Sequence, residues 1–145
     1  MVNVLIKKLD PAVEMPIYKT TGASGMDLMA FIKNPIKLEP QKSCLVPTGL
    51  SVAFPEEYEL QIRPRSGLAA KNNITVLNTP GTIDSDYRGE IKIILFNHGS
   101  KEFIINDKDR IAQMILMPVY KIDLQEVENL PKTVRGKDGF GSTGR

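Results

Sequence analysis

The chain ends in a glycine-rich stretch that has the spacing of a phosphate-binding loop. Residues 139–144 read GFGSTG, a G-x-G-x-x-G pattern, and only Arg145 follows them. In dinucleotide-binding folds and kinases this pattern needs a strand before it and a helix or strand after it. Glycines let a backbone approach a ligand closely, and hydroxyls and guanidinium groups suit phosphate. We therefore predict a lid that orders over a bound nucleotide, with walls from another part of the assembly, and with Arg135, Phe140, Ser142 and Thr143 as its contacts.

A second segment, RPRSGLA at 63–69, has the character of an anion site. Arg65, Ser66 and Gly67 lie where a strand is expected to meet a short helix, with Ser66 as the predicted N-cap. Free N–H groups, a hydroxyl and a guanidinium at such a junction can bind an anion. An ordinary capped helix with a surface arginine explains the same pattern equally well.

Two apolar stretches each contain an unexpected polar residue. ASGMDLMA at 23–30 has Asp27 inside a predicted strand, for which a turn-capping role is the simpler interpretation. DRIAQMILMPV at 109–119 is apolar from residue 111 onward except for Gln113. A buried glutamine needs partners for its donors and its acceptor. Either Gln113 makes a structural hydrogen bond across a sheet, or Arg110 and Gln113 face a polar cavity.

The segment NTPGTIDSDYRGE at 78–90 has the sequence of a hairpin. Pro80–Gly81 indicates a tight turn, and Asp84, Asp86 and Tyr87 lie at the predicted bend. The backbone N–H and C=O groups of such a loop can read the edge of a base. A solvated loop is the alternative, but two acids and a tyrosine beside glycines favour a site.

Composition excludes several kinds of chemistry. With one cysteine, Cys44, and one histidine, His98, the chain can form neither an internal disulfide nor a Cys/His or two-histidine metal site. A Ser-His-Asp triad would need His98, which lies in FNHGSKEF, a predicted hairpin turn where a solvated side chain is expected. Any metal is therefore expected to be a hard, oxygen-bound ion such as Mg²⁺.

Charge and hydropathy patterning exclude other partners. The net charge is +2 with acids and bases interspersed, which does not predict nucleic-acid binding. No apolar run is long enough for a signal peptide or a membrane span, so we expect a soluble cytoplasmic protein that does not bind membranes.

The elements that must position these residues are mostly short strands. The length of 145 residues predicts one domain. Short apolar runs separated by proline, glycine and asparagine predict strands, and Ile91, Ile93 and Leu95 alternate on one face of one of them. The helix candidate is SGLAAKN at 66–72. The sequence therefore predicts an all-β sandwich, jelly roll or barrel over 1–127 and a flexible arm over 128–145.

In chain order these five segments resemble the motifs of the trimeric dUTP diphosphatases (dUTPases). The matching stretches are ASGMDLMA, PRSGLA, GTIDSDYRG, DRIAQM and RGKDGFGSTG, which span residues 23–144. One motif alone is a weak signal, but five in order are specific. The sequence departs from the family pattern at Met26, where an aromatic is common, and at Lys108 and Asp138, where glycine is common. An acid at Asp138 is expected to weaken triphosphate binding slightly.

The resemblance implies a distorted β jelly-roll barrel with one short helix that assembles as a homotrimer with shared active sites. It implies hydrolysis of dUTP to dUMP and pyrophosphate with Mg²⁺, and Asp84 as the general base. Asp27 would support the metal through water, and Tyr87 would pack under the deoxyribose. The remaining implied substrate contacts are Arg65, Ser66, Gly67, Asn78, Gly81, Thr82, Ile83, Gln113, Arg135, Phe140, Gly141, Ser142 and Thr143. Deoxycytidine triphosphate deaminases, which share the fold but use a glutamate and typically lack the arm, and a non-catalytic nucleotide sensor remain as alternatives.

Overall fold

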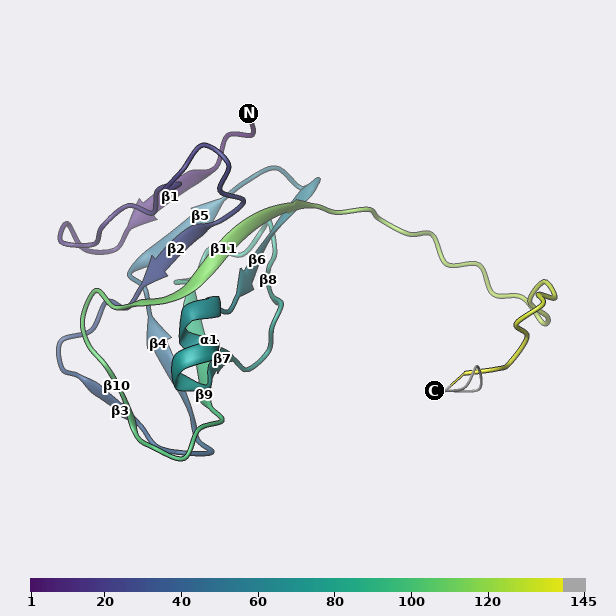
Figure 1. Ribbon diagram of the computed structural model, residues 1–145. Helices are drawn as coiled ribbons and strands as arrows, with labels where there is room; N and C mark the ends of the chain where they lie inside the picture. Colours follow the sequence, from purple (N-terminus) through teal and green to yellow (C-terminus); the bar gives the residue numbers. More distant parts are fainter. Residues whose placement is uncertain (140–145) are drawn as a thin grey trace.

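The structure, a computed structural model, describes residues 1–139 and consists mainly of short strands (Figure 1). In this part of the chain eleven strands accompany one helix. Their bounds are β1 Leu5–Lys8, β2 Met26–Met29, β3 Ile36–Leu38, β4 Ser43–Pro47, β5 Leu50–Ala53, β6 Tyr58–Arg63, α1 Ser66–Asn72, β7 Ile74–Val76, β8 Gly81–Ile83, β9 Lys92–Asn97, β10 Phe103–Ile105 and β11 Arg110–Pro118.

The strands form four antiparallel sheets around one core. The largest has the order β2-β11-β6-β8, the next is β4-β9-β7, and two pairs, β1-β5 and β10-β3, complete the arrangement. The predicted all-β class with one short helix is confirmed. The predicted barrel is wrong in one respect, because the sheets of residues 1–139 do not close into a continuous cylinder.

The core is built from the inward faces of these sheets. The alternation predicted for β9 is confirmed, since Ile93 and Leu95 are buried, as is Ile91 just before the strand. In β6 the buried residues are Leu60 and Ile62, and Glu59, Gln61 and Arg63, which alternate with them, are only partly buried. This alternation fixes which side chains of the largest sheet remain available for a site.

Two predicted hairpins are absent because the strands pair with distant partners. β8 pairs with β6, whereas β9 pairs with β4 and β7, so the strands that flank residues 84–91 belong to different sheets. β9 and β10 do not pair either, so the turn containing His98 connects two sheets. His98 itself is exposed, as predicted, and its ring lies 4.5 Å from that of Phe96.

The helix occupies the predicted residues but begins differently. α1 spans Ser66–Asn72, and its N-cap is Arg65, without any side-chain capping hydrogen bond. The prediction of Ser66 as the N-cap is therefore wrong. The backbone N–H of Ala69 already bonds to the carbonyl of Arg65, which makes Ser66 the first helical residue. With seven residues, this helix is too short to cross a bilayer, and residues 1–139 contain no other.

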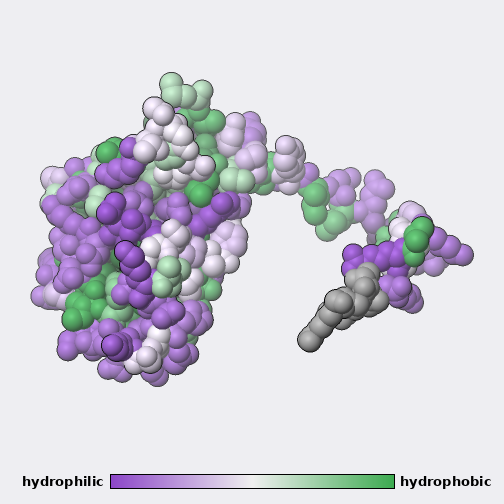
Figure 2. All heavy atoms as spheres, in the orientation of Figure 1, coloured by the Kyte–Doolittle hydropathy of each residue, from purple (hydrophilic) through white to green (hydrophobic). Residues whose placement is uncertain are grey.

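Beyond β11 the chain leaves the body of the fold. Residues 119–139 contain no strand or helix and lead away from the sheets (Figure 1). The backbone N–H of Val119 still bonds to the carbonyl of Glu57, but Tyr120, Ile122 and Leu124 have 77–87% of their surface exposed. In Figure 2 this segment appears as a thin extension beside the packed domain. The boundary at residues 127 and 128 remains a prediction.

Candidate active site

The predicted site residues lie in two groups along β6. Arg65, Ser66 and Gly67 follow the end of β6, close to Asp27 on β2 and Gln113 on β11. The other group lies on and beside β8, which pairs with β6 from Leu60 to Ile62. We call these groups the arginine side and the β8 side.

The centre of the arginine side is the carboxylate of Asp27. Its Oδ1 accepts a hydrogen bond of 2.8 Å from Arg65 Nε, and its Oδ2 lies 3.3 Å from Arg110 Nη1. Arg65 also donates to the carbonyl of Arg110 at 3.1 Å. The side chains of Asp27 and Arg65 are 19% and 26% exposed, so water screens their ion pair only in part. Arg110 is therefore an ion-pair partner of Asp27, which lies in strand β2 and accepts from both arginines.

Sheet register holds these groups together. Asp27 on β2 is opposite Gln113 on β11, and Gln113 is opposite Arg63 on β6, so the three lie in one row on the same face. Gln113 donates from Nε2 to the carbonyl of Pro64 at 2.9 Å, which ties β11 to the connection before α1. The predicted structural hydrogen bond of Gln113 is therefore present.

The structure excludes a side chain at Gly25 but leaves room for one at Gly67. A methyl group on Gly25 would lie 2.9 Å from Ile115 and 3.1 Å from Gln113 Oε1, so the sheet itself excludes a side chain. A methyl group on Gly67 would have no neighbour within 4 Å, and the backbone there is not left-handed. Among the described residues nothing requires a glycine at 67. Ser66 and Gly67 are both exposed beside Arg65, at the first N–H groups of α1.

The β8 side contains Asn78, Gly81, Thr82, Ile83, Asp84 and Tyr87. The amide of Asn78 lies over Gly81, because a methyl group there would be 3.2 Å from Asn78 Nδ2. A hollow of about 360 Å³ is lined by Leu45, Thr82, Ile83, Asp84, Tyr87, Glu90, Lys92 and Ile94. Its size suits part of a nucleotide, and Asp84 is exposed at its edge.

Hydrogen bonds within the loop hold the β8 side in place. The N–H of Tyr87 bonds to the carbonyl of Asp84 at 3.1 Å, and the Tyr87 hydroxyl donates to the carbonyl of Glu90 at 3.1 Å. Arg88 Nη1 donates to the carbonyls of Ser85 and Tyr87 at 2.7 and 2.9 Å. The sequence analysis did not identify Arg88 or Glu90 as site residues. Both hold the loop in its conformation, Arg88 by donating to loop carbonyls and Glu90 by accepting the Tyr87 hydroxyl.

Asp84 and Arg65 of one chain lie at different positions along β6. Asp84 follows Ile83, the partner of Leu60, and therefore lies near Glu59. Glu59 and Arg63 are four residues apart in β6, a separation of about 13 Å at the rise of a β-strand. Arg65 comes two residues after the end of β6.

The arm is also separate from both sides. The Nε of Arg135 donates to the carbonyl of Asp138 at 2.8 Å within an exposed turn. The predicted contacts Phe140, Gly141, Ser142 and Thr143 lie outside the described residues.

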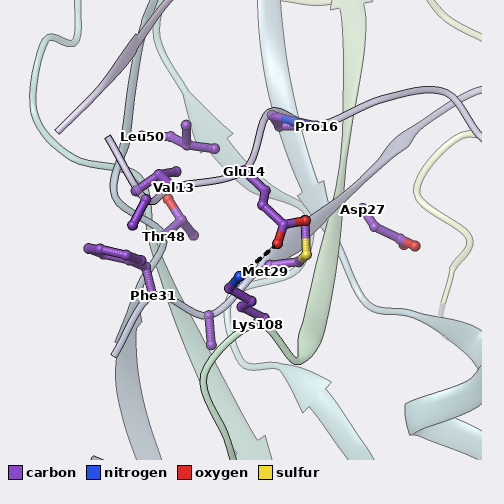
Figure 3. A pocket seen from close by; sticks show the side chains of 11 residues that line it. Val13, Glu14, Pro16, Asp27, Met29, Phe31, Thr48, Leu50 and Lys108 are labelled. Carbon is purple, nitrogen blue, oxygen red and sulfur yellow. Dashed lines mark ion pairs between the residues drawn. The ribbon is translucent and has the colours of Figure 1, made fainter. Parts of the chain in front are cut away.

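The small cavity near Asp27 does not extend the site. It has a volume of about 20 Å³, room for about one water molecule, and is lined partly by Glu14, Met29 and Lys108. Figure 3 shows Glu14 and Lys108 paired across its edge, at 3.0 Å, while the carboxylate of Asp27 points away from them. This hydrogen bond raises the pKa of Lys108. The cavity is too small for a nucleotide.

The residues do not form a protein cage for a metal. Within residues 1–139 no three His, Cys, Asp or Glu side chains come together, and both oxygens of Asp27 already face arginines. A hard cation needs about six oxygen ligands, which this chain alone does not offer there. Cysteine chemistry is not favoured either, because burial raises the pKa of the Cys44 thiol.

Comparison with known proteins gives one consistent result. The sequence model of the dUTPase family matches residues 12–144. Deoxyuridine 5'-triphosphate nucleotidohydrolase of Chlamydia pneumoniae is 56% identical over 138 residues, covering 94% of this chain and 95% of the relative. The protein of the same name from Fusobacterium nucleatum is 51% identical over the full length of both chains.

Solved structures show the same fold. The dUTPase of Staphylococcus bacteriophage 80alpha with dUpNHpp superimposes with a TM-score of 0.83 and 24% identity, covering 99% of both chains. A variant dUTPase of phage phi11, described with a structural Mg(II) ion, has a TM-score of 0.80 and 22% identity, covering 90% of this chain and 99% of the other. The sheets and the short helix thus define a protein with the dUTPase fold. With these relatives and this match, the chain belongs to the dUTPase family.

Proposed function

We propose that this protein hydrolyses dUTP to dUMP and pyrophosphate by attack of water on the α-phosphorus, with Asp84 as the general base. The observation that supports it best is the division of the site, with a guanidinium cluster just beyond β6 and an exposed acid beside a hollow that suits part of a nucleotide. The names of its relatives agree with this activity. Such an activity limits uracil incorporation into DNA and supplies dUMP for thymidylate synthesis, and we expect it in the cytoplasm.

The arginine side binds phosphate in this proposal. Two arginines and one aspartate leave this cluster with one net positive charge. Ser66 and Gly67 add a hydroxyl and backbone N–H groups, with room for a ligand because nothing packs over Gly67. Guanidinium groups bind phosphate oxygens in a fork that lysine cannot reproduce.

The β8 side binds the nucleoside. Asn78 and the backbone of Gly81, Thr82 and Ile83 read uracil, and Tyr87 packs against the deoxyribose, leaving no room for a 2′-hydroxyl. Asp84 is exposed next to these residues, where a carboxylate within about 2.6–3.2 Å of a water can remove its proton. Gln113 Nε2 has a second N–H besides the one that bonds to Pro64, and a phosphate contact uses that donor.

Mg²⁺ enters as part of the substrate in this proposal. The triphosphate supplies oxygens that the described residues do not, and a metal on the phosphates neutralises charge and fixes their geometry. Asp27 then acts at a distance, through water and through Arg65, since both of its oxygens already accept from arginines.

The site is shared between subunits of a homotrimer. The separation of about 13 Å between Glu59, near Asp84, and Arg63, near Arg65, supports a site in which the base and the phosphate-binding residues come from different chains. The arm supplies Arg135, Phe140, Gly141, Ser142 and Thr143 to a neighbouring site, a role supported by residues 119–139, which lead away from their own sheets (Figure 1). A cyclic head-to-tail arrangement closes such contacts into a ring.

A product assay tests the reaction. The protein is incubated with each deoxynucleoside triphosphate and with UTP, in Mg²⁺ and in EDTA, and pyrophosphate and ammonia are measured separately. Pyrophosphate from dUTP alone, dependent on Mg²⁺, is expected. Ammonia from dCTP would identify a deaminase, and binding without any product would identify a nucleotide sensor; either result would overturn the proposal.

Mixing two inactive variants tests the shared site. Asp84→Asn with an intact arm and a wild-type Asp84 chain lacking residues 135–145 are unfolded and refolded together. Each mixed trimer has one site with a good base and a good arm from the neighbour. At equal, random mixing roughly one quarter of all sites should recover activity. Confirmed mixed trimers without activity would show that the arm does not serve a neighbouring base.

A further inference from the structure

The ring of Tyr87 lies directly against the backbone of Gly89. A methyl group placed on Gly89 would be 2.5 Å from Tyr87 Cζ and 2.9 Å from Cε2, and closer still to the hydroxyl oxygen. Carbon atoms in van der Waals contact are about 3.5–4.0 Å apart. Any side chain at 89 would therefore push the ring away by roughly 1 Å.

Conformation does not explain this glycine. The backbone of Gly89 is outside the left-handed region, unlike that of Gly49, which has a φ of +68°. An alanine could adopt the Gly89 backbone without strain. The position requires the absence of a side chain, because atoms of the Tyr87 ring occupy the space where a Cβ of residue 89 would lie.

The tip of the ring is also held by a hydrogen bond to a segment that is itself anchored. Its hydroxyl donates to the carbonyl of Glu90, and the Glu90 carboxylate accepts the N–H of Gly49 at 2.8 Å. The N–H of Ile91 bonds to the carbonyl of Leu50 at 2.8 Å, which fixes this part of the chain to β5. Tyr87 remains 42% exposed, so one part of the ring is fixed while another faces the hollow beside Asp84.

We propose that Gly89 is a specificity-determining positioning residue, which sets the depth of the Tyr87 ring and thereby the discrimination between deoxyribose and ribose. This inference rests on the proposed role of Tyr87 under the sugar. Gly89 itself touches no substrate, because the Tyr87 ring covers it. The hydroxyl bond to Glu90 and the bare Cα of Gly89 act together: one holds the tip of the ring and the other admits it.

The test compares Gly89→Ala with the wild type as kcat/KM on dUTP and on UTP. Displacement of a substrate-contacting group by about 1 Å can cost up to roughly a hundredfold in rate. We expect the dUTP-to-UTP ratio of kcat/KM to fall about tenfold or more. Gly22→Ala is the matched control, since a methyl group there meets nothing within 4 Å and its backbone is not left-handed; its ratio should match that of the wild type.

A double-mutant cycle separates this role from a general effect on folding. Tyr87→Ala removes the ring, so adding Gly89→Ala to it should change the ratio no further. Tyr87→Phe keeps the ring and loses the hydroxyl bond, so it should lower the ratio less than Gly89→Ala does. Equal Tm values for Gly89→Ala and Gly22→Ala would exclude unfolding as the cause.

Two outcomes would overturn the inference. One is an unchanged dUTP-to-UTP ratio of kcat/KM in Gly89→Ala, which includes an equal loss on both nucleotides. The other is additive effects of Gly89→Ala and Tyr87→Ala on that ratio. Failure of the proposed function is distinguishable, because the wild type would then not hydrolyse dUTP at all. If the wild type discriminates but Tyr87→Ala discriminates equally well, the sugar contact of Tyr87 is wrong, and the role of Gly89 is wrong with it.

Discussion

The arginine side and the β8 side prepare for a ligand in different ways. On the arginine side the charged groups already satisfy one another, since Asp27 accepts from both Arg65 and Arg110. On the β8 side the backbone is tightly bonded and the chemical groups are left open, with Asp84 and Tyr87 both exposed. No hydrogen bond to the Asp84 carboxylate occurs within residues 1–139.

The two sides therefore differ in which internal contacts a ligand must displace. An anion that binds Arg65 competes with Asp27, so phosphate affinity depends on how readily that ion pair is shared. A water or sugar that approaches the β8 side displaces no internal bond of Asp84. The arginine side is thus adjusted by electrostatics and the β8 side by the shape of its backbone, and substitutions on the two sides should fail differently.

The largest effect is expected at Asp84. Asp84→Asn keeps the size of the side chain and removes the base, so kcat should fall by about 10²–10⁴, while binding of a non-hydrolysable dUTP analogue persists. The neighbouring exposed acid provides the control, and Asp86→Asn should retain activity. Steady-state kinetics and calorimetry measure the two properties. Comparable losses in both variants would mean that the acidity of the whole loop, and not the Asp84 carboxylate, matters.

The next effect should appear in stability at Gly49, whose N–H bonds to the carboxylate of Glu90 beside the hollow of the β8 side. Gly49 is left-handed, and a methyl group there would overlap Val13 and lie 3.0 Å from Phe31 Cδ1. Gly49→Ala should therefore lower the free energy of unfolding by about 1–3 kcal/mol, with Gly22→Ala near wild type. Urea denaturation followed by circular dichroism measures both. If Gly49→Ala is as stable as the control, the left-handed backbone of Gly49 and its contacts with Val13 and Phe31 do not determine the free energy of unfolding.

A moderate effect is expected on the arginine side. A lysine at position 65 cannot bond Asp27 Oδ1 and the carbonyl of Arg110 with the same fork as the guanidinium. Arg65→Lys should raise KM for dUTP about tenfold, an effect of roughly 1.4 kcal/mol, and leave sugar discrimination unchanged. Arg63→Lys, which changes a guanidinium bonded to Gln61, is the control. A change in the dUTP-to-UTP ratio for Arg65→Lys would contradict the separation of the two sides.

Local patterns in the sequence predicted elements better than partners. The strand at Ile93 and Leu95 and the helix from Ser66 follow from alternation and composition, and both are correct. The two hairpins were wrong because turn residues mark where a chain bends and do not show which strand it pairs with next. β8 pairs with β6, about twenty residues earlier, and no local signal separates that arrangement from a hairpin.

The site was predicted as a set of residues but not as an arrangement. Asp27 binds Arg65 and Arg110, which are 38 and 83 positions away along the chain, so spacing alone could not reveal the cluster. The role of Gly89 was also missed. The available signal was a glycine two residues after a tyrosine, but only the structure shows that the ring lies over it.

The smallest effect is expected at Lys108, next to Arg110. Lys108 has a φ of +65°, in the left-handed region where glycine is favoured, and it pairs with Glu14 at 3.0 Å. Lys108→Gly and Lys108→Ala both remove that ion pair, but only glycine relieves the backbone. The Tm of Lys108→Gly should therefore exceed that of Lys108→Ala by roughly 2–4 °C.

The ion pair between Lys108 and Glu14 makes the stability of the wild type depend on pH, whereas the two variants lack that pair. Because Glu14 raises the pKa of Lys108, the contribution of the pair is fully present below the ordinary lysine pKa and is lost as pH rises through the raised value. The Tm difference between the two variants, which both lack the pair, should instead be constant between pH 6 and 9. A Tm difference that changes over this range, or an alanine variant as stable as the glycine variant, would show that backbone strain at Lys108 does not lower the stability of the protein.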